Sequence, residues 1–229
     1  RRSQPSPGHR AAAWREALDA GMFANFHRVT AAAYKYPFAE LLVGTAQLIA
    51  ESNGIERIAH VRDKIAWLVM YAETILALSE ASCLKAIRDP LSGLCYPDPV
   101  IGNAAKFFFA DNYHNAVKYV QDIAGGIVAT IPSEHDWNNP ETQPLLEKYL
   151  AGSRKFSTED RFKIIHLVKD LVASELGGFW EVTSLHAEGS LAAERLATVA
   201  HADMKRYRAA ALRAAGLDGV ARHTTVTHS

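Results

Sequence analysis

Apolar residues recur at helical spacing through most of this chain. The clearest pattern covers residues 55–88, where apolar positions three and four residues apart define one face and mixed charges, such as Glu73 and Lys85, occupy the other. This spacing predicts a long amphipathic helix with one face in a core. Composition, capping residues and helix-ending glycines and prolines predict further helices at 11–20, 23–52, 100–124, 144–150, 157–174 and 190–215.

Glycine and proline mark the expected interruptions, because both are unfavourable inside a helix. We expect Gly21 to separate the first two helices, Pro37 to kink or divide the second, and Gly177–Gly178 to end the helix that Ser157 caps. Residues 89–99 contain three prolines and one glycine and are predicted to form a loop.

The absence of an alternating strand pattern and of an internal repeat predicts an all-α helical bundle. We divide the chain into a lead-in segment at 1–22, flexible or a short helix, a helical domain at 23–216 and a polar tail at 217–229.

Composition narrows the functional classes. The chain has 229 residues, of which 48% are apolar, and it carries 25 basic and 25 acidic side chains. This balance gives no overall field for nucleic acid or an anionic membrane surface, so neither is expected as a partner. Cys83 and Cys95 are too few for a disulfide framework, and we expect both to be small buried hydrophobes. The sequence shows no signal peptide and no long uncharged apolar stretch, which favours a cytoplasmic protein.

One group of chemically interesting residues lies on the second predicted helix. His27, Tyr34 and Lys35 are spaced so that an imidazole, a phenol and an ammonium group could share a cleft, with Arg28 beside them. Such groups can exchange protons, donate hydrogen bonds or hold an anion. The alternative is a basic pair on the helix surface with partly buried tyrosines.

A second group interrupts the helices between Gln121 and Asp136. Gly125 and Gly126 end a helix, and Pro132 then leads into the polar run Ser133-Glu134-His135-Asp136. Glycines let backbone approach a diphosphate, although adjacent glycines also simply end helices. A loop this polar suggests a ligand.

A third group is the segment 184–190, Ser-Leu-His-Ala-Glu-Gly-Ser, at the start of the last predicted helix. Free backbone N–H groups attract anions there, which places His186 well for a site, and Ser190 is a natural helix cap. The alternative is a capping loop with one exposed histidine. No spacing of histidines, cysteines or acids predicts a metal site, and no nucleotide-binding glycine motif is present.

Five separated motifs occur together in one order: Phe26-His27-Arg28 with Lys35, Tyr96-Pro97-Asp98-Pro99, the stretch 121–136, Glu147-Lys148-Tyr149-Leu150, and 184–190. In these motifs the chain resembles the C-terminal domain of the 4-hydroxyphenylacetate 3-hydroxylase and 4-hydroxybutyryl-CoA dehydratase family, over about residues 23–216.

This resemblance implies a helical bundle like the C-terminal domain of the acyl-CoA dehydrogenase fold, in a flavoprotein tetramer whose N-terminal and β-barrel domains are missing here. It implies FAD as cofactor, with Gln121, Gly125, Gly126, Pro132, Ser133, Glu134 and His186 as candidate contacts. It implies His27, Arg28 and Lys35 as candidate catalytic residues. The partners it implies are a phenolic or acyl-CoA substrate, further copies of the chain and a flavin reductase.

The family contains two chemistries. In the dehydratase branch, a [4Fe–4S] cluster takes a histidine and a cysteine spaced His-x6-Cys from this domain, whereas here His27 is followed by Tyr34 at the cysteine position. A phenol does not replace a thiolate ligand, so the resemblance favours the branch that hydroxylates aromatic rings with reduced flavin and O₂. A dehydratase or isomerase acting on a hydroxyacyl-CoA, and a non-catalytic remnant that only oligomerises, remain the alternatives.

Overall fold

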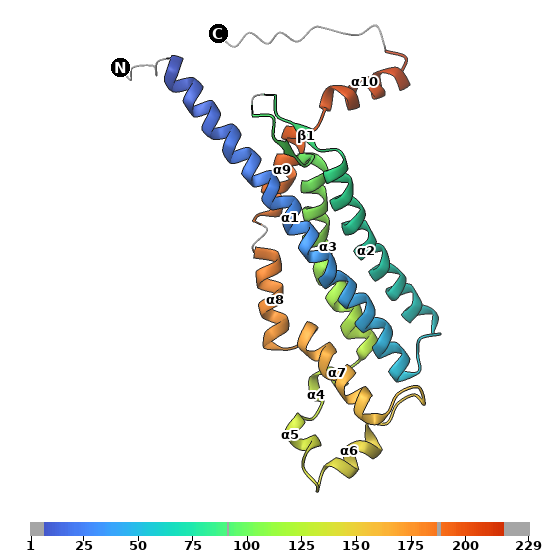
Figure 1. The fold of residues 1–229 in the computed structure, drawn as a ribbon. Coiled ribbons are helices and arrows are strands. Elements are labelled where there is room, and N and C mark those ends of the chain that lie inside the picture. Colours follow the sequence, from blue (N-terminus) through green and yellow to red (C-terminus); the bar gives the residue numbers. More distant parts are fainter. Residues whose placement is uncertain (1–6, 91, 187–188, 218–229) are drawn as a thin grey trace.

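Three long helices form the body of the molecule. The computed structural model describes residues 7–90, 92–186 and 189–217. Within them α1 (Pro7–Asn53), α2 (Ala59–Leu84) and α3 (Pro99–Ala124) run side by side as an elongated bundle (Figure 1). Asp98 begins α3 by accepting hydrogen bonds from the amides of Val100 and Ile101. The prediction of an all-α bundle is therefore confirmed.

The core lies where these helices meet. Leu42 of α1, Leu68 of α2 and Phe109 of α3 are completely buried. Leu68 belongs to the apolar face that the spacing in residues 55–88 predicted. The helix α7 (Thr158–Val172) adds Ile165 to the same core, and α9 (Leu191–His201) packs on α3. Fully burying side chains of this size contributes about 1.5–3 kcal/mol each.

Three short helices form the lower end of the molecule in Figure 1: α4 (Ile127–Thr130), α5 (Glu134–Trp137) and α6 (Gln143–Tyr149). The amide of Ser153 donates a 2.8 Å hydrogen bond to the carbonyl of Ser52, and its hydroxyl donates to the carbonyl of Glu51. The segment after α6 is therefore anchored to the end of α1, which fixes the start of α7.

The predicted loop at 89–99 contains a minimal hairpin. The strands β1 (Ile87–Arg88) and β2 (Cys95–Tyr96) pair antiparallel, with Ile87 opposite Tyr96. Among the described residues these are the only strands. Both cysteines are exposed, so the expectation that they are buried hydrophobes is wrong: Cys83 lies on an open face of α2 and Cys95 on the hairpin.

The expected end of a helix at Gly177–Gly178 is wrong. Both glycines lie inside α8 (Glu175–His186), which follows directly after α7. A Cβ on Gly177 would stand 3.0 Å from the carbonyl oxygen of Leu171. Glycine is used here because α8 packs closely on the end of α7, and not because the chain must leave a helix.

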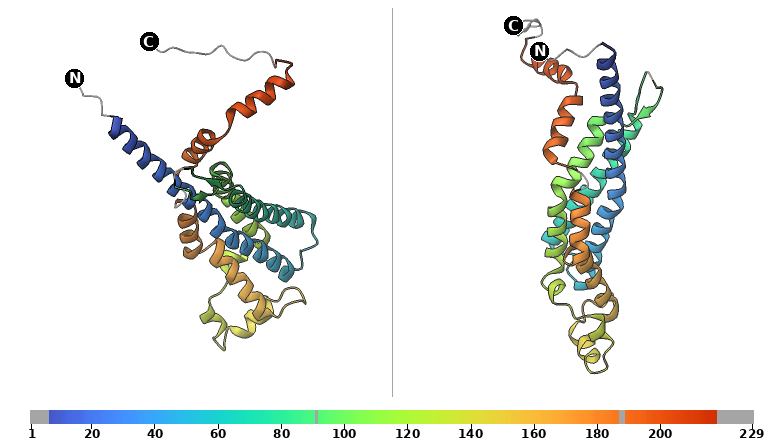
Figure 2. Two further views of the ribbon diagram at one scale, coloured as in Figure 1. Left: turned by 45° about the horizontal axis from the view of Figure 1, so that its top comes forward. Right: turned by 90° about the vertical axis from the view of Figure 1, so that its left-hand side faces the viewer.

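The single helix expected at 190–215 is divided. It consists of α9 and α10 (Met204–Ala214), separated at Ala202 and Asp203. The Asp203 side chain accepts a hydrogen bond from the amide of Arg206, so it caps a new helix. Figure 2 shows that α10 and the N-terminal part of α1 project away from the bundle.

The helix α1 is longer than predicted and continuous. It runs through Gly21 and through Pro37, so the divisions expected at both positions are wrong. Packing of α1 against α2 and α3 offsets the cost of a proline inside a helix, about 3 kcal/mol. Residues 7–22, expected as a lead-in, form the first part of α1. Except for Leu217, the predicted tail lies outside the described residues.

The helix α2 is long and apolar enough, by length and composition alone, to cross a membrane. A core helix passes the same test. Leu68, Tyr71 and Ile75 are buried in the bundle, whereas Val69 and Met70 are exposed on the opposite side.

Candidate functional site

The structure places Lys35 in the interior. Its side chain is 1% exposed, and its ammonium donates a 2.9 Å hydrogen bond to the carbonyl of Ser184. The ammonium also lies 4.9 Å from the ring centroid of Phe109 and 5.5 Å from that of Tyr34. Carbonyl and aromatic contacts together compensate for the desolvation of the charge. Lys35 therefore connects α1 with the end of α8.

His27 and Tyr34 occupy a different face of α1. Both are exposed, Tyr34 by 50%, and they are two turns apart on the outward side of the helix. The expected cleft that gathers an imidazole, a phenol and an ammonium is thus only partly formed in this chain. The Tyr34 ring lies beside the Lys35 ammonium, but the His27 imidazole faces solvent.

The most unusual charged residues were not singled out from the sequence. Lys106 on α3 and Glu194 on α9 are each 2% exposed, and their charged groups lie 3.8 Å apart. Burial lowers the pKa of Lys106 and raises the pKa of Glu194, while the attraction between them opposes both shifts. The positive charge of Arg28 acts on both groups, so a predicted site residue belongs to this buried charge cluster.

Neither oxygen of the Glu194 carboxylate has a hydrogen-bond partner, although one belongs to the 3.8 Å ion pair. A buried carboxylate without donors is costly, which makes this pair a strained contact between α3 and α9. The sequence pattern does not reveal this ion pair, because Lys106 and Glu194 are far apart in sequence and each residue alone resembles a charge on a helix surface. A charged residue at an otherwise apolar position of α3 was the only available signal.

The glycine loop lies at the other end of α3. Gly125 ends the helix with φ of 76° and Gly126 follows in a helical conformation; both are exposed, and a Cβ at either would meet nothing within 4 Å. Gln121 donates its side-chain amide to the carbonyl of Val172, which links α3 to the end of α7. The loop thus presents bare backbone with open space around it.

The polar run after Pro132 is largely a helix cap. Ser133 and Asp136 form a capping box, in which the Ser133 amide and hydroxyl both donate to the Asp136 carboxylate, at 2.8 Å and 2.7 Å. These hydrogen bonds hold the pKa of Asp136 below its usual range. The carbonyl of Pro132 is 2.9 Å from Nε2 of His166 on α7. Two of the four polar side chains in this run, Ser133 and Asp136, therefore stabilise the start of α5.

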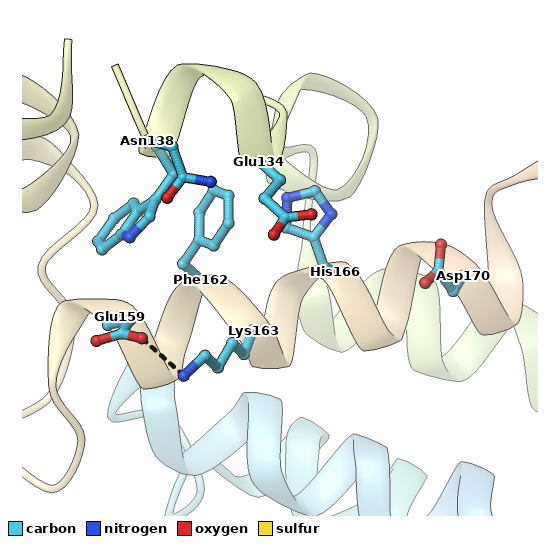
Figure 3. Close-up of a pocket in the computed structure, with 8 residues that line it drawn as sticks. Glu134, Asn138, Glu159, Phe162, Lys163, His166 and Asp170 are labelled. Atoms are coloured by element: carbon cyan, nitrogen blue, oxygen red, sulfur yellow. Dashed lines mark hydrogen bonds and ion pairs between the residues drawn. The ribbon is translucent and has the colours of Figure 1, made fainter. Parts of the chain in front are cut away.

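Glu134 instead lines an open cleft of about 380 Å³ between α5 and α7. Figure 3 shows its carboxylate close to the ring of His166, with the ring of Phe162 on the other side. Trp137 also lines this cleft. The rings of Trp137 and Phe162 are 4.7 Å apart and stacked, and Phe162 lies 4.4 Å from His166. The remaining lining residues are Asn138, Glu159, Lys163 and Asp170.

The predicted site residues therefore separate into two groups. Lys106, at the level of Arg28, precedes Gln121 by fifteen residues of α3, which corresponds to about 22 Å along the helix. Within one chain, the buried charge cluster and the exposed glycine loop are therefore two separate regions. His186 is the last residue of α8, but its side chain lies outside the described residues.

The part of the chain that the structure describes contains no group of three or more His, Cys, Asp or Glu side chains that could hold a metal ion. Tyr34, at the position of the expected cysteine ligand, is an exposed phenol.

Comparison with known proteins assigns this arrangement to a family. Residues 20–216 match the sequence model of the 4-hydroxyphenylacetate 3-hydroxylase (HpaB) C-terminal region. A Streptomyces globisporus monooxygenase, acting on a (3S)-3-amino-3-(3-chloro-4-hydroxyphenyl)propanoyl group carried by the peptidyl-carrier protein SgcC2, is 31% identical over 73% of this chain and 31% of its own length. The 4-hydroxybutyryl-CoA dehydratase/vinylacetyl-CoA isomerase of Clostridium aminobutyricum is 25% identical over 76% of this chain and 37% of its own.

Two solved structures show the same likeness. An oxygen-tolerant archaeal 4-hydroxybutyryl-CoA dehydratase from N. maritimus superposes with a TM-score of 0.79 at 29% identity, covering 90% of this chain and 41% of that one. The oxygenase component of 4-hydroxyphenylacetate 3-monooxygenase, in complex with FAD and 4-hydroxyphenylacetate, gives 0.79 at 25% identity, covering 87% and 42%. Both neighbours have the acyl-CoA dehydrogenase-like fold. The chain spans about a third of the length of the curated relatives it matches.

Proposed function

Because the chain belongs to the family of 4-hydroxyphenylacetate 3-hydroxylase C-terminal domains, we propose that it is the C-terminal domain of a flavin-dependent aromatic-ring hydroxylase. The observation that carries this proposal is the match over residues 20–216, combined with relatives that are monooxygenases of phenolic compounds. The substrate would be a phenolic small molecule. The reduced flavin would be delivered by a separate reductase.

The glycine loop fits a contact with FAD. Exposed backbone at Gly125 and Gly126, with no neighbouring side chain in the way, lets an extended diphosphate lie against it. Ser133 and Glu134, which are exposed at the start of α5 after the short helix α4, are further proposed contacts. When bound, reduced flavin supplies the electrons for O₂ activation. The loop is an open surface and not an enclosed pocket, so it would form one wall of a site completed by another domain or another copy.

The buried charge cluster fits a supporting role at the other end of the bundle. Arg28 would present a guanidinium to the substrate or cofactor, with Lys106 and Glu194 beside it. Lys35, tied to Ser184, would keep α8 in place. His27 is exposed and would contact the substrate or cofactor only across a domain or subunit boundary.

The second candidate function is a hydroxyacyl-CoA dehydratase, and the likeness to the N. maritimus dehydratase favours it. Against it stands Tyr34, which has no thiolate to offer iron. Iron analysis separates the two proposals. A protein that carries this chain together with the rest of the relatives' length should hold no stoichiometric iron after anaerobic purification. About four irons per chain would overturn the hydroxylase proposal.

The proposed protein is a homo-oligomer in the cytoplasm, and neither nucleic acid nor a membrane is among its proposed partners. A third possibility is a helical remnant that binds no flavin. It is considered because the chain spans about a third of the length of the curated relatives it matches. Binding of FAD by this chain decides against a remnant.

A further inference from the structure

The cleft between α5 and α7 has an aromatic floor, formed by Trp137 and Phe162. These two rings are stacked with their centroids 4.7 Å apart, and stacked rings form a rigid apolar surface. The α7 side of the cleft is one face of the helix, because its lining residues lie three or four positions apart: Glu159, Phe162, Lys163, His166 and Asp170. The volume of about 380 Å³ suits a small organic molecule.

The charges along this cleft are not balanced. Glu159, at one end, forms a 2.7 Å ion pair with Lys163, and no other lysine or arginine is among the eight lining residues. The acidic end of the cleft consists of Glu134 and Asp170, which are both exposed. Within the described part of the chain, neither of these two side chains forms an ion pair. The acidic end therefore carries negative charge that no lysine or arginine neutralises.

His166 lies between the aromatic floor and the acidic end. Its Nε2 is 2.9 Å from the carbonyl oxygen of Pro132, and because a carbonyl only accepts, this nitrogen carries the hydrogen. In the neutral ring Nδ1 is then an acceptor. Figure 3 shows the Glu134 carboxylate close to this ring. The acidic end thus contains carboxylate and imidazole acceptors next to an aromatic surface.

An organic cation matches this set of groups best. An ammonium group has three N–H donors and no acceptor, and aromatic rings favour organic cations placed against them. A metal ion is a poorer match, since among the described residues no three His, Cys, Asp or Glu side chains converge to hold one. The carboxylates of Glu134 and Asp170 repel an anion such as a phosphate from this end of the cleft.

We propose that this cleft binds a small organic ammonium ion, with its ammonium group at the acidic end and a flat apolar group against the aromatic floor. Glu134, Asp170 and Nδ1 of His166 accept the hydrogen bonds, and Trp137 and Phe162 supply the apolar contact. The inference goes beyond the proposed flavin contact, because it needs neither glycine of the loop. Asp170 is not among the proposed flavin contacts, so its replacement separates the two proposals.

The probe is 2-phenylethylammonium, in which two carbons join a ring to an ammonium group. It is titrated into a protein that carries this chain together with the rest of the relatives' length, and ligand-observed NMR follows binding. We expect a Kd of about 1 mM or tighter, as is usual for a ligand of this size. Two matched compounds should bind at least about tenfold more weakly: 2-phenylethanol, which lacks the charge, and 3-phenylpropanoate, which reverses it.

Variants distinguish binding in this cleft from binding at the substrate site of the proposed hydroxylase. Glu134→Gln/Asp170→Asn should weaken binding of the probe by about tenfold or more. Asp170→Asn alone should weaken it without changing the affinity for FAD. Glu134→Lys/Asp170→Lys should reverse the preference and favour 3-phenylpropanoate, a gain that a misfolded protein would not show.

The matched control is Glu73→Gln/Glu80→Gln, which removes two exposed carboxylates from α2 and should bind the probe like the unmodified protein. Three results would overturn the proposal: no binding of the probe, equal binding of 2-phenylethanol, or unchanged binding by Glu134→Gln/Asp170→Asn. The flavin proposal fails separately. A protein that binds the probe but no FAD contradicts only the flavin contact, and one that binds FAD but not the probe contradicts only this inference.

Discussion

At the scale of single residues, the most informative feature is the ion pair between Lys106 and Glu194. Both side chains are buried, and the carboxylate lacks hydrogen-bond donors. Replacing only Lys106, as in Lys106→Met, removes the ion-pair partner of a buried carboxylate and leaves Arg28 as its remaining positive charge, and should lower the free energy of unfolding by about 3 kcal/mol. Replacing both, as in Lys106→Met/Glu194→Leu, should cost much less. Urea unfolding of the three proteins measures this, and equal losses in the single and double variants would contradict the pair's coupling.

The same residues predict a pH dependence with a definite sign. Burial raises the pKa of Glu194 in the folded chain. A raised pKa favours the folded state below the unfolded pKa, and this contribution is lost as pH rises through the folded value. In the Lys106→Met background the larger of the two opposing charges is gone and Arg28 remains, so stability should increase as pH falls from 8 toward 5. Lys106→Met/Glu194→Gln should lack this gain, and the difference between the two unfolding curves isolates Glu194.

At the scale of elements, close approach of α1 and α3 depends on Gly102. A Cβ there would stand 2.6 Å from Cγ2 of Val29 and 3.2 Å from Oγ of Ser82. Because a β-branched valine in a helix has one strongly preferred rotamer, the helices must separate. Gly102→Ala should therefore lower the free energy of unfolding by about 1–3 kcal/mol.

Gly44 provides the control on the same bundle. It lies inside α1, and a Cβ there would meet nothing within 4 Å. Gly44→Ala should raise the free energy of unfolding by roughly 0.5–1 kcal/mol, through helix propensity alone. Thermal unfolding of both variants should give shifts of opposite sign, and shifts of the same sign would contradict the packing assigned to Gly102.

Elements also show where sequence reasoning was sufficient and where it was not. Periodicity identified α2 and α3, because each buries one face of regularly spaced apolar residues, and the capping residue Ser157 identified the start of α7. Glycine gave the wrong boundary at Gly177, where it serves a close contact, and the right one at Gly125, where φ is positive. The local sequence does not distinguish a glycine that ends a helix from one that allows close packing, because close packing depends on a neighbouring helix in the fold.

At the scale of the whole molecule, the family was found from the resemblance of five motifs and not from the periodicity of apolar residues. The five motifs placed the chain in its family, but they did not show that Lys106, in the Arg28 cluster, and Gln121, before the glycine loop, stand about 22 Å apart along α3. Nor did they reveal Glu194, which reaches Lys106 only through the fold. A site assembled from such separated surfaces needs other domains or copies of the chain, consistent with a chain that spans about a third of its curated relatives.

The claim that this bundle contributes to a flavin site is tested most directly by titrating FAD with a protein that carries this chain together with the rest of the relatives' length, and following fluorescence quenching. We expect binding in the micromolar range. Gly126→Glu, whose helical backbone accepts a side chain, should weaken it at least about tenfold by placing a carboxylate against the diphosphate. Gly178→Glu makes the same change at another exposed glycine with open space and should bind like the unmodified chain. No quenching by the unmodified chain, or equal binding by all three, would contradict a flavin contact at the glycine loop.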